Sequence, residues 1–156
     1  MEVDSYKTIL QSCEAELKVS KSKFISQISP VNNSEEINKA LISVRKKNYD
    51  AAHHPFAYRL GLDENNFRYS DDGEPSGSAG KPIMEVIDKF ELTNVLLVVT
   101  RYFGGVKLGV GGLRRAIFEA SELVVQNAEI ITKQITENFN IEFDYKYIGA
   151  IMNFIE

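Results

Sequence analysis

The sequence lacks the features that would point to an exported or membrane-embedded protein. Cys13 is its only cysteine, so an internal disulfide and a thiolate zinc site are both excluded. The first ten residues contain neither the basic stretch nor the continuous apolar stretch of a signal peptide. The densest apolar run, residues 95–99, is far too short to cross a bilayer. These absences predict a cytoplasmic protein with no membrane segment.

Charge of neither sign dominates the chain. Eighteen lysines and arginines stand against 22 aspartates and glutamates, which gives a formal net charge of −4. This balance argues against a globally basic nucleic-acid binder, although it leaves room for local basic patches. The chain has 156 residues, of which 44% are hydrophobic and 26% charged. That is the size and composition of about one soluble folded domain.

Hydrophobic spacing predicts a fold that contains both helices and strands. Alternation of apolar and polar residues predicts strands, and apolar residues three and four positions apart predict helices. The expected strands are residues 15–19, 24–28, 56–60, 67–69 and 95–99, and the expected helices begin near residues 33, 82 and 113. Residues 95–99 are apolar throughout, which is typical of a central strand covered on both faces.

The last part of the sequence has a separate pattern. Residues 139–147 alternate apolar and polar side chains, which predicts one strand, and residues 148–155 begin an apolar helix. A single strand and a short helix cannot enclose a core of their own. We therefore expect a first domain over residues 1–130. A linker and an incomplete second unit then occupy residues 131–156, and this unit needs the first domain or a partner as cover.

A segment rich in glycine and arginine follows the expected central strand. Its cations are Arg101, Lys107, Arg114 and Arg115, and its glycines are Gly104, Gly105, Gly109, Gly111 and Gly112. No acidic residue lies between residues 92 and 118, so these four cations give the segment a local charge of +4. Glycines admit the close approach of a ligand, and a helix N-terminus attracts anions. The segment is therefore a candidate binding site for phosphate or nucleic acid.

Two interpretations of this segment stay open. Arg114 and Arg115 lie near an expected helix start, where a cation opposes the helix dipole by about 0.3–1 kcal/mol, and a bound anion would compensate for that cost. In the other interpretation, Arg101 and one helical arginine pair with carboxylates of the protein itself, and no ligand binds. The glycine spacing matches neither the dinucleotide-binding fingerprint nor the Walker A loop, so no cofactor is predicted.

A second, acidic segment precedes the expected helix near residue 82. Its polar and glycine residues are Asp71, Asp72, Gly73, Glu74, Ser76, Gly77, Ser78, Gly80 and Lys81. The three carboxylates are potential Mg²⁺ ligands, but their spacing fails the EF-hand pattern. Pairing with the cations of residues 101–115, or with turn N–H groups, is favoured instead. His53 and His54 are interpreted as structural, and no metal site or catalytic residue is assigned.

Four short segments give the sequence a family resemblance. They are Ser22-Lys-Phe-Ile25, Ala57-Tyr-Arg59, Tyr69-Ser-Asp-Asp-Gly-Glu-Pro-Ser-Gly77 with Ala79-Gly80, and Arg101-Tyr-Phe-Gly-Gly105 with Leu108-Gly-Val-Gly-Gly-Leu113. From residue 5 to residue 128 the chain resembles the IMPACT N-terminal domain family, which includes the bacterial YigZ proteins. The resemblance implies an α+β fold, a two-layer α/β sandwich similar to domain 2 of ribosomal protein S5. A mixed sheet with its helices on one face is expected.

The same resemblance implies a non-catalytic binding or regulatory role linked to translation. The implied partners are RNA, the ribosome or a translation-regulatory protein, bound through the glycine and arginine loop. Residues 131–156 resemble the start of a ferredoxin-like C-terminal domain, and self-association through residues 139–156 is a further expectation. The alternative is a phosphoryl-transfer or phosphate-ester enzyme with a glycine-loop anion site, by fold-level analogy to small-molecule kinases. A pure protein-interaction module is the third hypothesis.

Overall fold

The helices and strands follow the hydrophobic pattern over most of the chain. The structure, a computed structural model, describes residues 4–155. In chain order its elements are β1 (Ser5–Ile9), β2 (Cys13–Val19), β3 (Ser22–Pro30), α1 (Ser34–Lys47), β4 (Phe56–Arg59), β5 (Phe67–Ser70), α2 (Gly80–Lys89), β6 (Val95–Tyr102), α3 (Gly109–Asn127), β7 (Ile130–Gln134), the 3-10 turn η1 (Tyr145–Tyr147) and α4 (Ile148–Ile155). The expected α+β class is confirmed.

Five strands form the main sheet, in the order β2-β3-β6-β4-β5. β6 lies in the centre, as its apolar sequence predicts, and residues 95–99 are buried. All four strand pairings in this sheet are antiparallel, whereas the family resemblance implied a mixed sheet. The reason is that two hairpins, β2–β3 and β4–β5, flank β6. Each hairpin places its inner strand beside β6 in the opposite direction.

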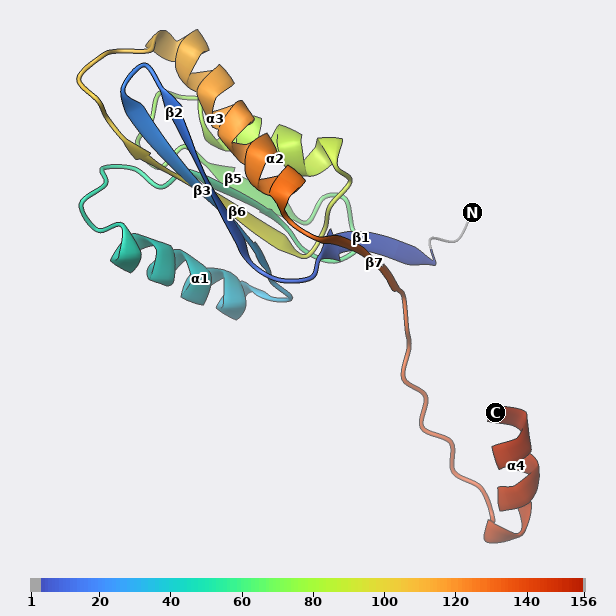
Figure 1. Ribbon diagram of the computed structural model, residues 1–156. Coiled ribbons are helices and arrows are strands. Elements are labelled where there is room, and N and C mark those ends of the chain that lie inside the picture. The colour runs from blue at the N-terminus through green and yellow to red at the C-terminus, as the bar shows by residue number, and fades with distance from the viewer. Residues whose placement is uncertain (1–3, 156) are drawn as a thin grey trace.

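Helices cover both faces of this sheet, so the expectation of helices on one face is wrong. Figure 1 shows α1 on one side of the strands and α2 with α3 on the other. Leu96 and Val98 pack toward α1, while Val95, Leu97 and Val99 pack toward α2 and α3. Since β6 is apolar on both faces, a single helical layer would leave one face in water. Each such side chain contributes about 1.5–3 kcal/mol when it is buried.

Local signals in the sequence predict the start of α1 more accurately than the start of α3. Asn33 caps α1, because its side chain accepts a hydrogen bond of 2.9 Å from the backbone N–H of Glu36. In return, the Glu36 carboxylate accepts one of 2.7 Å from the backbone N–H of Asn32. α3 begins at Gly109, four residues before the predicted start at Leu113. The second half of the glycine loop is therefore already helical.

The C-terminal part differs from its prediction. β7 pairs with β1, and Ile130 lies opposite Ile9, so the expected linker begins as a strand. The strand predicted over residues 139–147 is wrong, because residues 135–144 have no regular structure and η1 follows them. A strand needs a neighbouring strand to pair its backbone groups, and Figure 1 shows no sheet edge beside this segment. The predicted helix from residue 148 is confirmed, while the division of the chain into domains stays a prediction.

The arm formed by residues 136–155 lies apart from the two sheets (Figure 1). α4 has no buried residue, and its Phe154 is 91% exposed. Phe139 and Tyr145, which precede α4, are 78% and 84% exposed. This arm therefore adds little to the core. Within residues 4–155, no helix combines the length and the apolar character needed to cross a membrane.

We predict that the two ends of this arm differ in their effect on stability. Removal of residues 136–156 should leave the melting temperature within about 2 °C of the full chain, because the removed side chains cover no core. Removal of residues 130–156 also deletes β7, which exposes the buried Ile9, and should lower the melting temperature clearly. Differential scanning fluorimetry of the three chains tests this. An equal decrease of the melting temperature in both truncated chains would contradict this prediction.

The same variants test self-association through residues 139–156, which stays a prediction. The exposed apolar side chains of the arm are the expected contact. Sedimentation equilibrium should then give a larger mass for the full chain than for the chain without residues 136–156, after correction for length. Two monomeric masses would remove the hypothesis.

Candidate binding site

The two glycine-rich segments meet at one end of the main sheet. Arg101, near the end of β6, places its Nη1 atom 3.1 Å and 3.2 Å from the two carboxylate oxygens of Glu74. The side chains of Arg101 and Glu74 are only 14% and 3% exposed. The prediction that a carboxylate of the acidic segment pairs with a cation of the second segment is therefore confirmed. This buried ion pair fixes the two loops against each other.

A second cation of the glycine loop is also bound within the protein. Arg114, in the second turn of α3, lies 2.6 Å and 2.8 Å from the two carboxylate oxygens of Glu85 on α2. It also donates a hydrogen bond of 3.0 Å to the backbone carbonyl of Gly77. Arg101 and one helical arginine therefore pair with carboxylates of the protein, as the second interpretation of this segment expected. Glu85 supplies the compensation that Arg114 needs near a helix start.

Lys107 and Arg115 differ from those two arginines. Both are exposed, and neither makes an ion pair within residues 4–155. α3 begins without a side-chain cap, because Leu108 at the cap position makes no such hydrogen bond. The first N–H groups of a helix with no cap keep their capacity to bind an anion. Two exposed cations and a helix start are thus the part of the loop that is available to a ligand.

The acidic segment is built around Asp71. Its Oδ1 atom accepts hydrogen bonds of 3.1 Å and 2.8 Å from the N–H groups of Ala79 and Gly80, and its Oδ2 atom accepts one of 2.9 Å from Gly77. Burial by itself would raise the pKa of Asp71, but the three N–H donors together outweigh it and hold this pKa below its ordinary value. Asp71 therefore shapes the loop and starts α2.

The other polar residues of this segment are mostly engaged in the turn. Asp72 accepts a hydrogen bond of 2.8 Å from the N–H of His54 and contacts Arg45 at 3.4 Å. The Ser78 hydroxyl donates to the carbonyl of Pro75. Ser76 and Lys81 are exposed, and no role for them follows from their contacts.

His54 is buried beneath the site. Its Nδ1 atom lies 3.0 Å from the hydroxyl of Thr100. Burial lowers its pKa, Asp72 raises it, and the neighbouring Arg45 and His53 lower it, with a net result below the ordinary value. These contacts are those of a structural histidine. No group of three or more histidine, cysteine and acidic side chains poised for a metal ion occurs in the part of the chain that the structure describes.

Close contacts with other parts of the protein explain two of the glycines. A Cβ atom on Gly104 would lie 1.9 Å from the backbone oxygen of Lys21, in the turn between β2 and β3. A Cβ atom on Gly73 would lie 2.8 Å from the His53 ring. The Gly104 N–H also donates to the hydroxyl of Ser22 at 3.4 Å. The β2–β3 turn is thus a third component of the site, and sequence reasoning missed it.

A groove runs along this end of the sheet. Its larger part has a volume of about 600 Å³ and is lined by Asp50, Ala51, Ala52, His53, Gly73, Glu74, Pro75, Arg101, Tyr102, Phe103 and Lys107. An adjoining cavity of about 210 Å³ shares Pro75, Arg101 and Lys107 with it and reaches Val110 on α3. We call these two cavities together the two-loop groove. Both glycine-rich segments line it.

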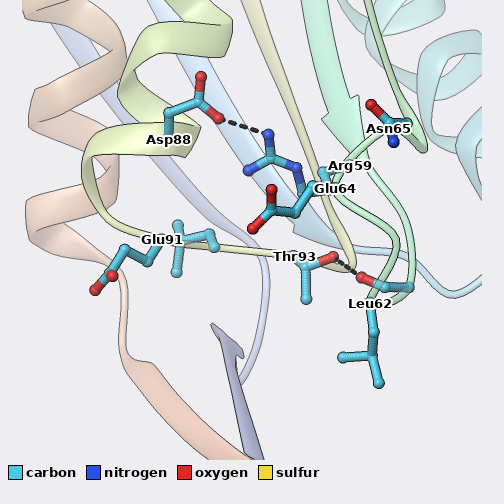
Figure 2. Close-up of a pocket in the computed structure, with 9 residues that line it drawn as sticks. Arg59, Leu62, Glu64, Asn65, Asp88, Glu91 and Thr93 are labelled. Carbon is cyan, nitrogen blue, oxygen red and sulfur yellow. Dashed lines mark hydrogen bonds and ion pairs between the residues drawn. The ribbon is translucent and has the colours of Figure 1, made fainter. Parts of the chain in front are cut away.

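A separate cavity of about 510 Å³ lies at the other end of β4 (Figure 2). Its centre is occupied by Arg59, whose Nη2 atom lies 2.6 Å from a carboxylate oxygen of Asp88. The guanidinium carbon of Arg59 also lies 5.8 Å from the centroid of the Phe67 ring. Neither glycine-rich segment contributes to this cavity, and its arginine is already paired. The two-loop groove is therefore the stronger candidate site.

We predict that the Arg101–Glu74 pair stabilises the fold far more than an exposed pair does. Glu74→Ala leaves Arg101 as a buried charge without its partner, which should lower the free energy of unfolding by about 3–5 kcal/mol. Glu35→Ala is the control, because it breaks the exposed pair of Glu35 with Lys39, worth about 0.3–0.5 kcal/mol. Urea unfolding measures both variants. Similar losses in both would contradict a special role for the buried pair.

We also predict that Asp71 makes stability depend on acid pH. Its pKa is lowered in the folded protein, so it stabilises the fold above the unfolded pKa near 3.8, and this contribution is lost as the pH falls through the lower folded value. Asp71→Asn should lower the melting temperature at pH 7, because the amide nitrogen that replaces one carboxylate oxygen cannot accept the hydrogen bonds which that oxygen accepts. The difference from the unchanged protein should shrink below about pH 4. A constant difference from pH 7 to pH 2 would argue against this role.

The sequence matches one protein family over most of its length. The Impact N-terminal domain family matches residues 20–125. IMPACT family member YvyE of Bacillus subtilis is 36% identical over 149 residues, which cover 96% of this chain and 69% of YvyE. IMPACT family member YigZ of Escherichia coli is 38% identical over 136 residues, which cover 86% of this chain and 67% of YigZ.

A solved structure agrees with the fold. A crystal structure described only as that of a hypothetical protein is 27% identical, covers 97% of this chain and superimposes with a TM-score of 0.85, while the chain covers 75% of it. This superposition spans nearly the whole chain, and the family match contains the four short segments from Ser22 to Leu113. The chain therefore belongs to the IMPACT family.

Proposed function

We propose that this chain is a non-catalytic binding protein of the translation apparatus, which uses the two-loop groove to hold RNA, the ribosome or a translation-regulatory protein. The observation that carries the proposal is the convergence of both glycine-rich segments on one surface groove. Membership of the IMPACT family supports the link to translation, as the resemblance implies. The cytoplasm is the corresponding location.

The cations of the glycine loop fall into two groups, one that holds the loops in place and one that is available to a partner. Arg101 and Arg114 are paired with Glu74 and Glu85, so they hold the loops in place. Lys107 and Arg115 are exposed without an ion pair among the described residues, and they keep their full charge toward a partner. An acidic partner is therefore favoured, because it would compensate these two charges.

The phosphoryl-transfer alternative receives less support from the same contacts. Such an enzyme would need a carboxylate that is available to bind Mg²⁺ or to activate a hydroxyl. Asp71 is held by three backbone N–H groups, Asp72 by His54 and Arg45, and Glu74 by Arg101. All three carboxylates of the acidic segment are thus committed to structural contacts.

We predict that the exposed cations and the paired cation affect different measurements. Lys107→Gln with Arg115→Gln should weaken cosedimentation with ribosomes from cell extract and leave the melting temperature unchanged. If these residues contact phosphates, the salt dependence should become shallower by about 0.7–0.9 per contact removed. Arg114→Ala should instead lower the melting temperature, since it breaks contacts to Glu85 and Gly77.

A charge-matched control is Lys39→Gln with Lys133→Gln, on α1 and β7, away from the groove lining. This variant should cosediment like the unchanged protein. Full ribosome binding by the Lys107 and Arg115 variant would contradict the groove as the ribosome site, and no binding by the unchanged protein would remove the ribosome as its partner.

A further inference from the structure

Two lysines from a distant part of the sequence extend the basic surface of the groove. The turn between β2 and β3 reaches the glycine loop, since only a glycine at position 104 leaves room for the Lys21 backbone. Lys23 lies opposite Tyr102 in the pairing of β3 with β6, and its Nζ atom is 4.7 Å from the Tyr102 ring centroid. The turn and the sheet register therefore place Lys21 and Lys23 beside the groove, although about 80 residues separate them from the glycine loop in sequence.

Lys107 lines the groove, the Lys21 backbone and the Lys23 ammonium lie beside groove residues, and the Arg115 guanidinium lies beside Gly111 in the first turn of α3. These four cations have no ion-pair partner within residues 4–155. The carboxylates that line the groove do not compensate them directly. Glu74 is paired with Arg101, and Asp50 accepts a hydrogen bond of 2.8 Å from the Tyr102 hydroxyl. The surface thus carries positive charge in a chain whose net charge is −4.

An exposed aromatic ring lies among these cations. Phe103 lines the groove and is 59% exposed, which is unusual for a phenylalanine that follows a buried strand. The guanidinium of Arg101 lies 5.6 Å from its ring centroid. Because Arg101 is itself held by Glu74, it supports the ring in one position. The ring is then a platform on which a planar group can stack.

We propose that the ligand of this surface is a single-stranded nucleic acid. Lys21, Lys23, Lys107 and Arg115 contact successive phosphates, and one base stacks on Phe103. A single strand offers an unstacked base to an aromatic side chain, whereas a duplex keeps its bases stacked inside. This inference rests on the proposed function and selects the class of ligand that the groove holds.

The test is a binding titration of the full chain with a fluorescent 12-nucleotide RNA and with the same RNA as a duplex, at several salt concentrations. The single strand should bind more tightly than the duplex. Its salt slope should be about 3, from four contacts at about 0.7 each. Lys21→Gln with Lys23→Gln should lower this slope by about 1.4.

The aromatic contact gives a separate readout. Phe103→Ala should weaken single-strand binding by about 5- to 150-fold without changing the salt slope, since it removes a base stack and no charge. Phe139→Ala, at an exposed position on the arm, is the matched control and should bind normally. Melting temperatures of all variants exclude unfolding as the cause of a loss.

The outcomes separate this inference from the proposed function. Equal affinity for duplex and single strand, or an unchanged affinity of Phe103→Ala, overturns the inference. So does the absence of binding to either RNA while ribosome cosedimentation still depends on Lys107 and Arg115. In that last case the groove holds another part of the ribosome, and the proposed function survives. If the unchanged protein binds neither ribosomes nor either RNA, both the inference and the proposed binding of ribosomes and RNA are overturned.

Discussion

The buried ion pair between Arg101 and Glu74 is the contact on which the rest of the site depends. It joins the end of the central strand to the acidic loop, and both side chains are almost fully removed from water. A charge in that position is tolerated only while its partner is present. The conformations of the two loops are therefore coupled. Arg114 adds a second tie, from α3 to α2 and to the carbonyl of Gly77. These contacts hold the loops on either side of the groove in place, which would reduce the ordering cost of binding a ligand.

The sequence was informative where a local pattern decides the structure. The spacing of apolar residues predicted α1, α2 and the strands β2 to β6, and the Asn33 cap follows from neighbours three residues apart. Where the outcome depends on a distant partner, the same patterns failed. Residues 139–147 alternate as a strand does, yet no strand edge lies beside them to bond their backbone groups. For β6 the local pattern was right, because its apolar residues indicated a strand covered on both faces. The helices on one face only, expected from the family resemblance, were wrong.

The candidate site was predictable in its residues but not in its pairings. Sequence showed that four cations and three carboxylates lie in two loops, and one pair between them could be expected. It could not show that Arg114 pairs with Glu85, because Glu85 lies outside both loops on the surface of α2. Nor could it bring Lys23 to Tyr102, because that contact follows from the register of β3 with β6. The missed signal is Lys21 in the tight turn between β2 and β3, because β3 pairs with β6 and brings this turn to the glycine loop.

The glycines have different causes, and this bears on which part of the loop is open to a ligand. Positions 104 and 73 require glycine because other parts of the protein occupy the space that a side chain would need. Their presence is therefore no sign of a ligand.

Gly111 is different, because a Cβ atom there would meet only the Arg115 side chain, at an ordinary distance of 3.6 Å. Packing within the protein does not require a glycine at that position. The lack of a side chain leaves the first turn of α3 open beside Arg115, and Leu108 at the cap position of this helix makes no side-chain hydrogen bond. The case for a ligand thus rests on the exposed cations, Phe103 and this open turn, and not on the number of glycines.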